Sequence, residues 1–285
     1  MSQDWYSLFV PDATPDEVAS ALESLLSGQG YHAYDPFPGG TGTPPNLREM
    51  VRLFVAPADQ GWVRVVGQVD EALLPALSES LGKPVICGWV DGSSGGFTVF
   101  REGERHDGPG ALKPYLRGDQ TGEVLQQAFT GNLPVPPVES SGPPVMVVGA
   151  DAIPPDVQQL AAEKGVDTKQ AGKLFEKLSS SLFGKLERDA QEGSREEQEQ
   201  ARAILSGEAR NVWNSLNGQR VRAIAGVLRL PDHWRTPEWQ TLRDAYHVHR
   251  LRERNPRMPL LPGDEDALKA VPDALKYRPV YMGRE

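Results

Sequence analysis

Residues 131–155 are the feature that most limits how this chain can fold. Seven prolines fall within this stretch. Because proline fixes φ and lacks a backbone N–H, such a segment cannot continue a helix or lie inside a sheet. We therefore expect a semi-rigid, extended linker here. The whole chain has 285 residues, which is enough for one ordinary domain on each side of the linker.

Before this linker, residues 1–130 alternate between strand-type and helix-type patterns. Val51–Val55 and Trp62–Val66 flank a short glycine turn and are typical of a β-hairpin. A helix is predicted from Pro15 to Gly28, where a capping box opens it, and a second one from Asp70 to Gly82. The simplest packing places both helices on one face of a mostly antiparallel sheet. The sequence therefore predicts an acidic α+β domain over residues 1–130.

After the linker, residues 156–285 change to a helical pattern. Apolar residues recur at three- and four-residue spacing between Leu174 and Leu186. Residues 187–200 are nearly all charged or amide, which indicates a solvated helix or hairpin tip. A further helix begins near Pro237, and four prolines follow Met258. We expect a mainly α-helical C-terminal domain with a proline-rich tail.

Cysteine content and hydropathy bear on the compartment. Cys87 is the only cysteine, so an internal disulfide and a cysteine-rich zinc site are both excluded. It lies in an apolar run and is interpreted as a small buried hydrophobe, with a catalytic thiol as the alternative. The N-terminus has no signal-peptide pattern, and no window approaches the roughly 18 apolar residues of a membrane helix. We expect a cytoplasmic protein without a membrane partner.

Charge is distributed unevenly along the chain. Residues 1–135 hold 8 Lys and Arg against 17 Asp and Glu, whereas residues 136–285 hold 22 of each. Within the second part, Arg210–Arg257 contains 10 arginines, no lysine and 4 acidic residues. The sequence therefore predicts an acidic domain joined to a helical domain that has a basic segment.

The helix predicted over residues 237–254 concentrates this positive charge. At 100° per residue, four basic side chains fall within roughly 60° of one another. These four residues, here named the basic stripe, are Arg243, His247, Arg250 and Arg254. Arginine forks suit carboxylate or phosphate groups better than lysine does. The basic stripe is therefore the candidate binding site.

Three interpretations of the basic stripe remain open. It could be a solvated cationic face, as many surface helices have. It could instead meet an acidic surface, either of a partner or of the N-terminal domain itself. It could also bind nucleic acid, with nearby aromatic rings stacking on bases. The candidate stacking or anchoring rings are Trp234, Trp239 and Tyr246, with Trp213 as a further one.

The sequence predicts no catalytic residue, no metal site and no cofactor. His247 and His249 are two positions apart, so on a helix they diverge and cannot hold one metal ion. Asp244 and His247 have the spacing of a base and its orienting partner, but such surface pairs are usually structural. The glycine-rich run at residues 39–44 lacks the lysine and the following helix of a phosphate-binding loop.

These observations favour a non-enzymatic intracellular interaction protein, either inhibitor- or immunity-like or an adaptor. It would act through surfaces of complementary charge, which steer encounters and fix their register, and its partner would be another protein. One alternative is a nucleic-acid-associated factor that uses residues 210–257. The other is a hydrolase or transferase with a site at the domain junction, where pockets tend to occur.

Overall fold

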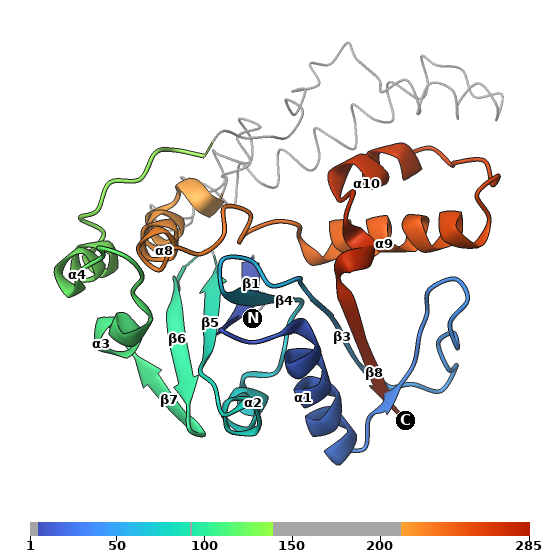
Figure 1. Ribbon diagram of the computed structural model, residues 1–285, viewed down its shortest axis with the longest axis horizontal. Coiled ribbons are helices and arrows are strands. Elements are labelled where there is room, and N and C mark those ends of the chain that lie inside the picture. Colours follow the sequence, from blue (N-terminus) through green and yellow to red (C-terminus); the bar gives the residue numbers. More distant parts are fainter. Residues whose placement is uncertain (1–4, 92, 139–211) are drawn as a thin grey trace, which may run out of the picture. The chain divides into compact units, whose positions relative to one another are not determined.

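The structure is a computed structural model, and it divides the chain into two compact units (Figure 1). One unit combines residues 1–136 with residues 216–285, and the other covers residues 137–215. The residues that the structure describes are 5–91, 93–138 and 212–285. The predicted linker beyond residue 138 and the predicted helical segment 156–211 therefore lie outside the described residues.

The first unit is built on one antiparallel sheet of eight strands, in the order β2-β8-β3-β4-β1-β5-β6-β7. The strands are β1 (Trp5–Pro11), β2 (His32–Ala33), β3 (Glu49–Val55), β4 (Trp62–Val66), β5 (Val85–Val90), β6 (Gly95–Arg101), β7 (Glu104–Asp107) and β8 (Arg278–Arg284). The predicted hairpin is present as β3 and β4. Together with the helices, the sheet confirms the α+β class.

Seven α-helices fall within the described stretches. They are α1 (Pro15–Gly28), α2 (Leu74–Leu81), α3 (Pro109–Leu112), α4 (Gly122–Thr130), α8 (Leu216–Val227), α9 (Trp239–Arg254) and α10 (Asp264–Ala270). Short 3-10 turns lie at η1 (Glu71–Leu73), η2 (Lys113–Tyr115), η3 (Val212–Asn214) and η4 (Ala274–Lys276). The predicted capping box opens α1, because Thr14 and Glu17 each accept a hydrogen bond from the other's backbone N–H.

The C-terminal strand β8 changes the predicted division of the chain. It pairs with β3 along its whole length, with Leu53 opposite Val280, and with the short β2. Residues 216–285 therefore belong to the same unit as the N-terminal sheet, whereas the sequence suggested a separate helical domain over 156–285. The sequence did not predict this strand because Pro279 and Gly283 are poor strand formers and weaken its pattern. Pro279 fits because β2 pairs only with residues 282–283, so its missing N–H falls on an unpaired side.

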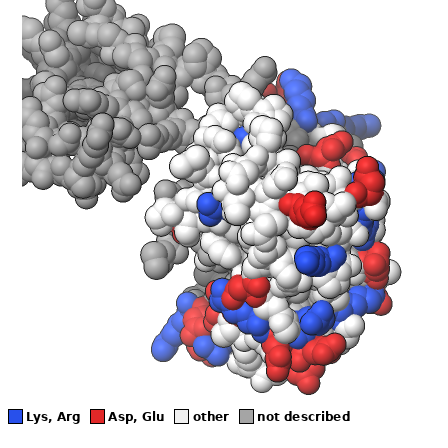
Figure 2. All heavy atoms as spheres, turned by 90° about the vertical axis from the view of Figure 1, so that its left-hand side faces the viewer, with Lys and Arg blue, Asp and Glu red and all other residues white. Residues whose placement is uncertain are grey.

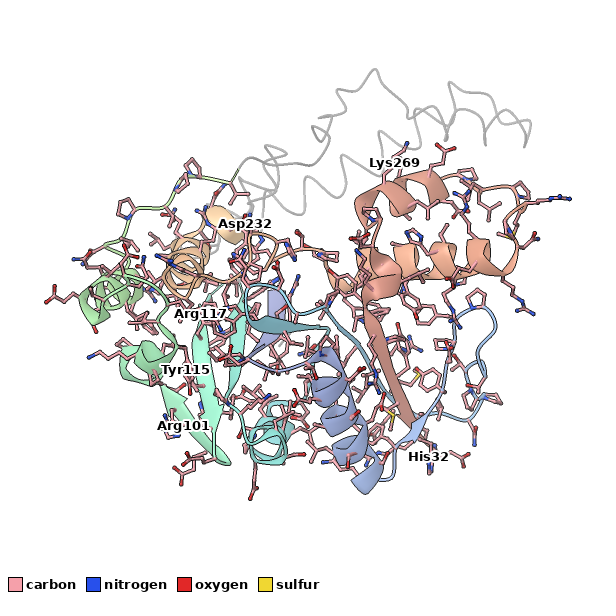
Figure 3. The ribbon with its side chains drawn as sticks, viewed as in Figure 1. His32, Arg101, Tyr115, Arg117, Asp232 and Lys269 are labelled. Atoms are coloured by element: carbon pink, nitrogen blue, oxygen red, sulfur yellow. The ribbon has the colours of Figure 1, made fainter. Side chains whose placement is uncertain are left out.

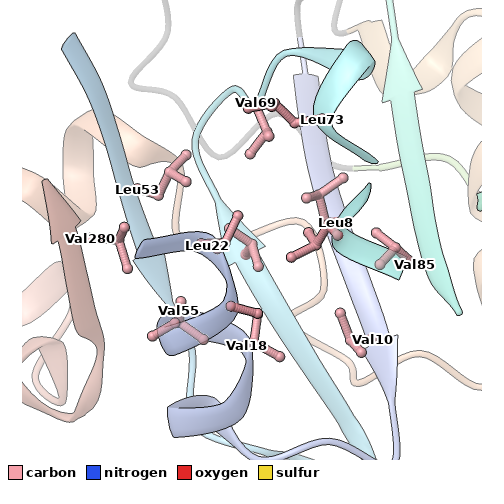
Figure 4. Close-up of a cluster of buried hydrophobic side chains, with 14 of the residues drawn as sticks. Leu8, Val10, Val18, Leu22, Leu53, Val55, Val69, Leu73, Val85 and Val280 are labelled. Atoms are coloured by element: carbon pink, nitrogen blue, oxygen red, sulfur yellow. The ribbon is translucent and has the colours of Figure 1, made fainter. Parts of the chain in front are cut away.

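One face of the sheet is covered by α1 and α2, as the sequence predicted. Side chains from β1, β3, β4, β5 and β8 form one apolar cluster with these helices (Figure 4). Leu8, Val18, Leu22 and Val280 are each at most 1% exposed in this cluster. We call this side of the sheet the first face. Nearly all of its elements come from residues before 113.

The opposite side, the second face, is covered by α8 and α9 (Figure 1). Leu242, Ala245 and Tyr246 of α9 pack on Phe54 and Tyr281 of the sheet. Near β6, α8 approaches so closely that a Cβ at Gly95 would lie 3.3 Å from the Val221 side chain. Both helices come from the C-terminal segment, so this face exists only when the two ends of the chain are together.

Candidate functional site

Helix α9 carries the predicted basic stripe but begins at Trp239, two residues after the predicted start at Pro237. Its apolar face, which includes Leu242, Ala245 and Tyr246, is buried against the second face of the sheet. The helix ends at Arg254, and Asn255 caps it through a bond to the Leu251 carbonyl. The sequence pattern therefore identified both the helix and its buried side.

Arg243, the first residue of the basic stripe, is held against its own helix. Its Nε and Nη2 donate to Asp244 Oδ1 at 2.8 and 2.6 Å. Its guanidinium also lies 5.2 Å from the centre of the Trp239 ring. Such a cation–π contact and an adjacent carboxylate together balance the charge locally. Arg243 is thus largely committed within α9.

Arg250, the third residue of the basic stripe, contacts the N-terminal segment. Its Nη2 donates to Asp35 Oδ2 at 3.2 Å, and the two side chains are 29% and 38% exposed. Its Nε is buried without a hydrogen-bond partner. At this residue the arrangement matches the second interpretation, in which the stripe meets an acidic group of the N-terminal part.

His247 and Arg254, the other two stripe residues, are exposed to solvent. Arg254 has two exposed neighbours of the same charge, Arg252 and Arg257. We name Arg252, Arg254 and Arg257 the arginine end of α9. Among the described residues, none of these three forms an ion pair with a carboxylate. Leu261, in the loop that follows, is 66% exposed.

The predicted stacking rings are part of the protein core. Trp234 is 8% exposed and meets Trp5 edge to face, with ring centres 5.0 Å apart. Tyr246 is 7% exposed and packs 4.6 Å from Phe37. Trp239 is half-buried beneath Arg243. None of the three offers a free ring face to a base, because each side chain faces the second face of the sheet. Trp213 belongs to the other unit.

Other arginines of the C-terminal segment pair with N-terminal carboxylates. Arg278 bonds to Asp16 and Glu23, and Arg284 bonds to Glu49. The acidic and the basic segment therefore neutralise each other in part within one unit. In agreement with this, positive and negative side chains intermix on the face seen in Figure 2, where no large area has a single sign. The acidic and the basic segment of the sequence therefore do not form two separate domains of opposite charge.

A buried arginine that the sequence reasoning missed holds the connection between α8 and α9. Arg64 of β4 is 7% exposed and donates to Ser7 Oγ at 2.9 Å. It also donates to the carbonyls of Thr236, Arg235 and His233 at 2.7, 3.1 and 3.4 Å. Burial lowers the pKa of Arg64 to about 10, so it remains protonated at neutral pH. A lone arginine inside the apolar run Trp62–Val66 was the available signal.

Among the described residues, the side chains considered for catalysis are not arranged as a catalytic or metal-binding site. Asp244 binds Arg243 and makes no recorded bond to His247. His249 Nε2 lies 3.1 Å from the Val271 carbonyl oxygen. Burial raises the pKa of the Cys87 thiol to about 12, so it is no thiolate at neutral pH. Within the described stretches, no three His, Cys, Asp or Glu side chains gather as metal ligands.

Comparison with known proteins adds no further assignment. No protein-family model, no curated protein and no solved structure matches the chain. In the parts of the chain that the structure describes, no helix combines the length and the apolar content needed to cross a membrane.

Proposed function

We propose that this protein is a non-enzymatic interaction protein that binds an acidic surface of a protein partner through the arginine end of α9. An inhibitor and an adaptor role are both compatible with this mode of binding. The observation that carries the proposal is the contrast between committed and uncommitted arginines. Arg243 and Arg250 are bonded to Asp244 and Asp35, whereas the three residues of the arginine end have no ion pair among the described residues.

The neighbourhood of the arginine end supports a protein partner. The following loop, residues 255–263, contains three prolines and the exposed Leu261. Proline restricts such a loop before binding, which lowers the entropy lost when a partner orders it. Arginines around an apolar side chain suit a protein interface, where arginine is enriched and carboxylates can bind its fork.

Burial of the aromatic rings disfavours the nucleic-acid alternative. Proteins that bind single strands combine positive charge with exposed rings on which bases stack. Trp234 and Tyr246 are buried, and Trp239 is covered by Arg243. The arginine end could still contact phosphates, so the test below includes an oligonucleotide.

The test compares two defined acidic probes on the full-length chain. Binding to poly-glutamate and to a single-stranded 20-nucleotide DNA would be measured at increasing salt concentrations. We expect poly-glutamate to bind more tightly than DNA. In the variant Arg252→Glu, Arg254→Glu, Arg257→Glu, we expect at least a tenfold loss, because each contact contributes about 0.5 kcal/mol and reversal adds repulsion. The wild-type chain and this variant would then be compared in affinity capture to identify the natural partner.

A charge-matched variant separates this surface from net charge. Arg48→Glu, Lys113→Glu, Lys269→Glu makes the same change in total charge at three exposed positions elsewhere. We expect this variant to keep most of the binding. Equal losses in both variants, or no binding to poly-glutamate at low salt, would contradict the proposal. Tighter binding to DNA, lost in the first variant alone, would favour the nucleic-acid alternative.

A further inference from the structure

A cavity of about 400 Å³ lies at the sheet edge formed by β7, away from α9 in the sheet order. It is bounded by the last two strands of the sheet and by the short helix α3. Its lining residues are Val99, Arg101, Arg105, His106, Asp107, Gly110 and Ala111. A volume of this size is within the range of small-molecule sites. Arg101 lies beside this edge, and Tyr115 of η2 lies next to it (Figure 3).

The strand register separates the lining residues into two sets. Val99 of β6 is opposite His106 of β7, and Arg101 is opposite Glu104. Because side chains alternate along a strand, Val99, Arg101 and His106 project from one side of the sheet. Arg105 and Asp107 project from the other side. Two basic side chains therefore stand on the same side as the apolar Val99, and Glu104, opposite Arg101, projects from this side as well.

Bonds outside the cavity already engage the charges of the second set. Arg105 donates to Asp107 at 2.9 Å and bonds to Glu71 as well. Asp107 also accepts a hydrogen bond from the Thr98 hydroxyl at 2.8 Å. The Arg105 guanidinium and these bonds hold the pKa of Asp107 below its ordinary value. The carboxylate of the lining is thus bonded chiefly to Arg105 and Thr98, and His106 contributes a smaller electrostatic interaction with it.

Arg101 and His106 are the polar side chains of the lining that project from the same side as Val99. Among the described residues, no carboxylate forms an ion pair with Arg101, and the His106 ring has no recorded hydrogen bond. Arg101 lies within hydrogen-bonding reach of Tyr115; burial raises the pKa of that tyrosine, and the nearby Arg101 partly lowers it. Both side chains are half-buried. The lining contains two arginines and one carboxylate, so its formal charge is positive, while Glu104 stands opposite Arg101 without being part of the lining.

The charged side chains near β7 could serve only to prevent the sheet edge from pairing with another chain, but this explains only part of their arrangement. Charged side chains on an edge strand hinder pairing with another chain, and all four residues of β7 are polar or charged. That purpose is served by Glu104 and by the Arg105–Asp107 pair, of which only the pair projects from the other side of the sheet. It does not require a cation on the neighbouring inner strand, where Arg101 stands, nor a cavity beside it.

We propose that this cavity binds a small organic anion. The fork of Arg101 would grip a phosphate or carboxylate group with two parallel hydrogen bonds. His106 would supply another polar contact, and Val99 and Ala111 would cover the carbon skeleton. Gly110 and Ala111 leave room for this skeleton, since a Cβ at Gly110 meets nothing within 4 Å. This site is independent of the function proposed for α9.

The test is a titration of the full-length chain with 3-phosphoglycerate, inorganic phosphate, citrate and, as a neutral control, glycerol. Calorimetry would give affinity and stoichiometry, and amide NMR shifts would locate the site. We expect saturable one-to-one binding of at least one anion, with shifts concentrated between residues 99 and 115. A preference for 3-phosphoglycerate over citrate would identify phosphate as the recognised group, and the reverse would identify carboxylate.

Three variants decide whether the cavity is the site. We expect Arg101→Gln to weaken binding at least tenfold, whereas Lys113→Gln, which removes the same charge from a nearby exposed position, changes it less than twofold. We expect Gly110→Leu to weaken binding severalfold without any change in charge. Equal losses in the Arg101 and Lys113 variants, unchanged binding in Arg101→Gln, or no saturable binding at low salt would overturn the proposal.

Discussion

The two faces of the sheet are built from different parts of the chain. The first face is covered by α1 and α2, which follow closely in sequence on the strands that they cover. The second face is covered by α8 and α9, which come from the other end of the chain. The same sheet therefore has one face assembled mainly from near neighbours, with β8 as the long-range exception, and one covered entirely by helices from the other end of the chain. The contacts of the second face join the N-terminal and the C-terminal segment, so they cannot be inferred from the sequence of either segment alone.

The long-range polar contacts of the two faces differ in how deeply they are buried. Arg64 on the second face bonds to three carbonyls of residues 233–236, about 170 positions away. Asp35 and Arg250 form another long-range pair. The first face has long-range ion pairs too, because Arg278 of β8 bonds to Asp16 and Glu23 of α1, but the Arg278 side chain is 33% exposed. We infer that polar contacts hold the C-terminal segment on both faces, and that the buried Arg64 contributes most to fixing it in place.

The largest effect is expected from Arg64→Ala. It leaves the Ser7 hydroxyl and three carbonyls without their donor and opens a cavity, which we expect to cost about 4 kcal/mol of unfolding free energy. Urea unfolding measures this. Arg52→Ala is the control, since Arg52 donates to the Tyr34 hydroxyl and is only half-buried, and we expect it to cost about 1 kcal/mol. Equal losses of unfolding free energy in the two variants would show that the buried bonds of Arg64 contribute no more than an ordinary hydrogen bond.

A matched pair of leucines tests whether the two faces unfold together. Leu22 on the first face and Leu242 on the second are 1% and 0% exposed. We expect Leu22→Ala and Leu242→Ala each to cost about 3 kcal/mol, the usual result for a buried leucine. We also expect each to accelerate amide exchange in α1 and α9 alike. If Leu242→Ala affected α9 alone, the faces would be separate folding units.

The Asp35–Arg250 contact should have a smaller effect, because both side chains are partly exposed. A double-mutant cycle with Asp35→Ala and Arg250→Ala should give a coupling energy of about 0.5 kcal/mol at low salt. It should shrink as salt is added, since exposed charges are screened. A coupling of zero would mean that the pair contributes nothing to holding α9.

The smallest effect is expected in the β5–β6 turn, which belongs to neither helical layer. Backbone N–H groups of Ser93 and Ser94 donate to the Asp91 carboxylate and lower its pKa to about 2. A lowered folded-state pKa adds stability above pH 4 that is lost as the pH falls toward 2. We therefore expect Asp91→Asn to cost about 0.5 kcal/mol at pH 7. In acid-dependent urea unfolding this difference should disappear near pH 2; a constant difference would contradict the assignment.

Much of the fold could be predicted where the pattern is local. The capping box of α1, the β3–β4 hairpin and the amphipathic α9 were all evident in the spacing of residues. Strand β8 was not, because Pro279 and Gly283 weaken its strand pattern and its partner β3 lies over 200 residues earlier. Periodicity records which side of an element is buried, but it does not record which distant element buries it.

The site was predictable to the same extent. Helical spacing located the basic stripe correctly on one helix, but it could not show that Arg250 meets Asp35 or that Arg243 lies over Trp239. The stacking rings were misjudged for a similar reason, because an aromatic near arginines on a helix can equally be a core residue. The cavity beside β7 depends on the β6–β7 register and on α3, so the sequence offered no direct signal for it.

The most direct test of this account concerns residues 1–136 in isolation. The sequence suggested an independent N-terminal domain, whereas the structure completes its sheet and second face with residues 216–285. The fragment would be studied by urea unfolding and by amide NMR dispersion, with the full-length chain as reference. We expect no cooperative transition and poorly dispersed amides, with recovery when a peptide of residues 216–285 is added. A dispersed spectrum and cooperative unfolding of the fragment alone would contradict the account.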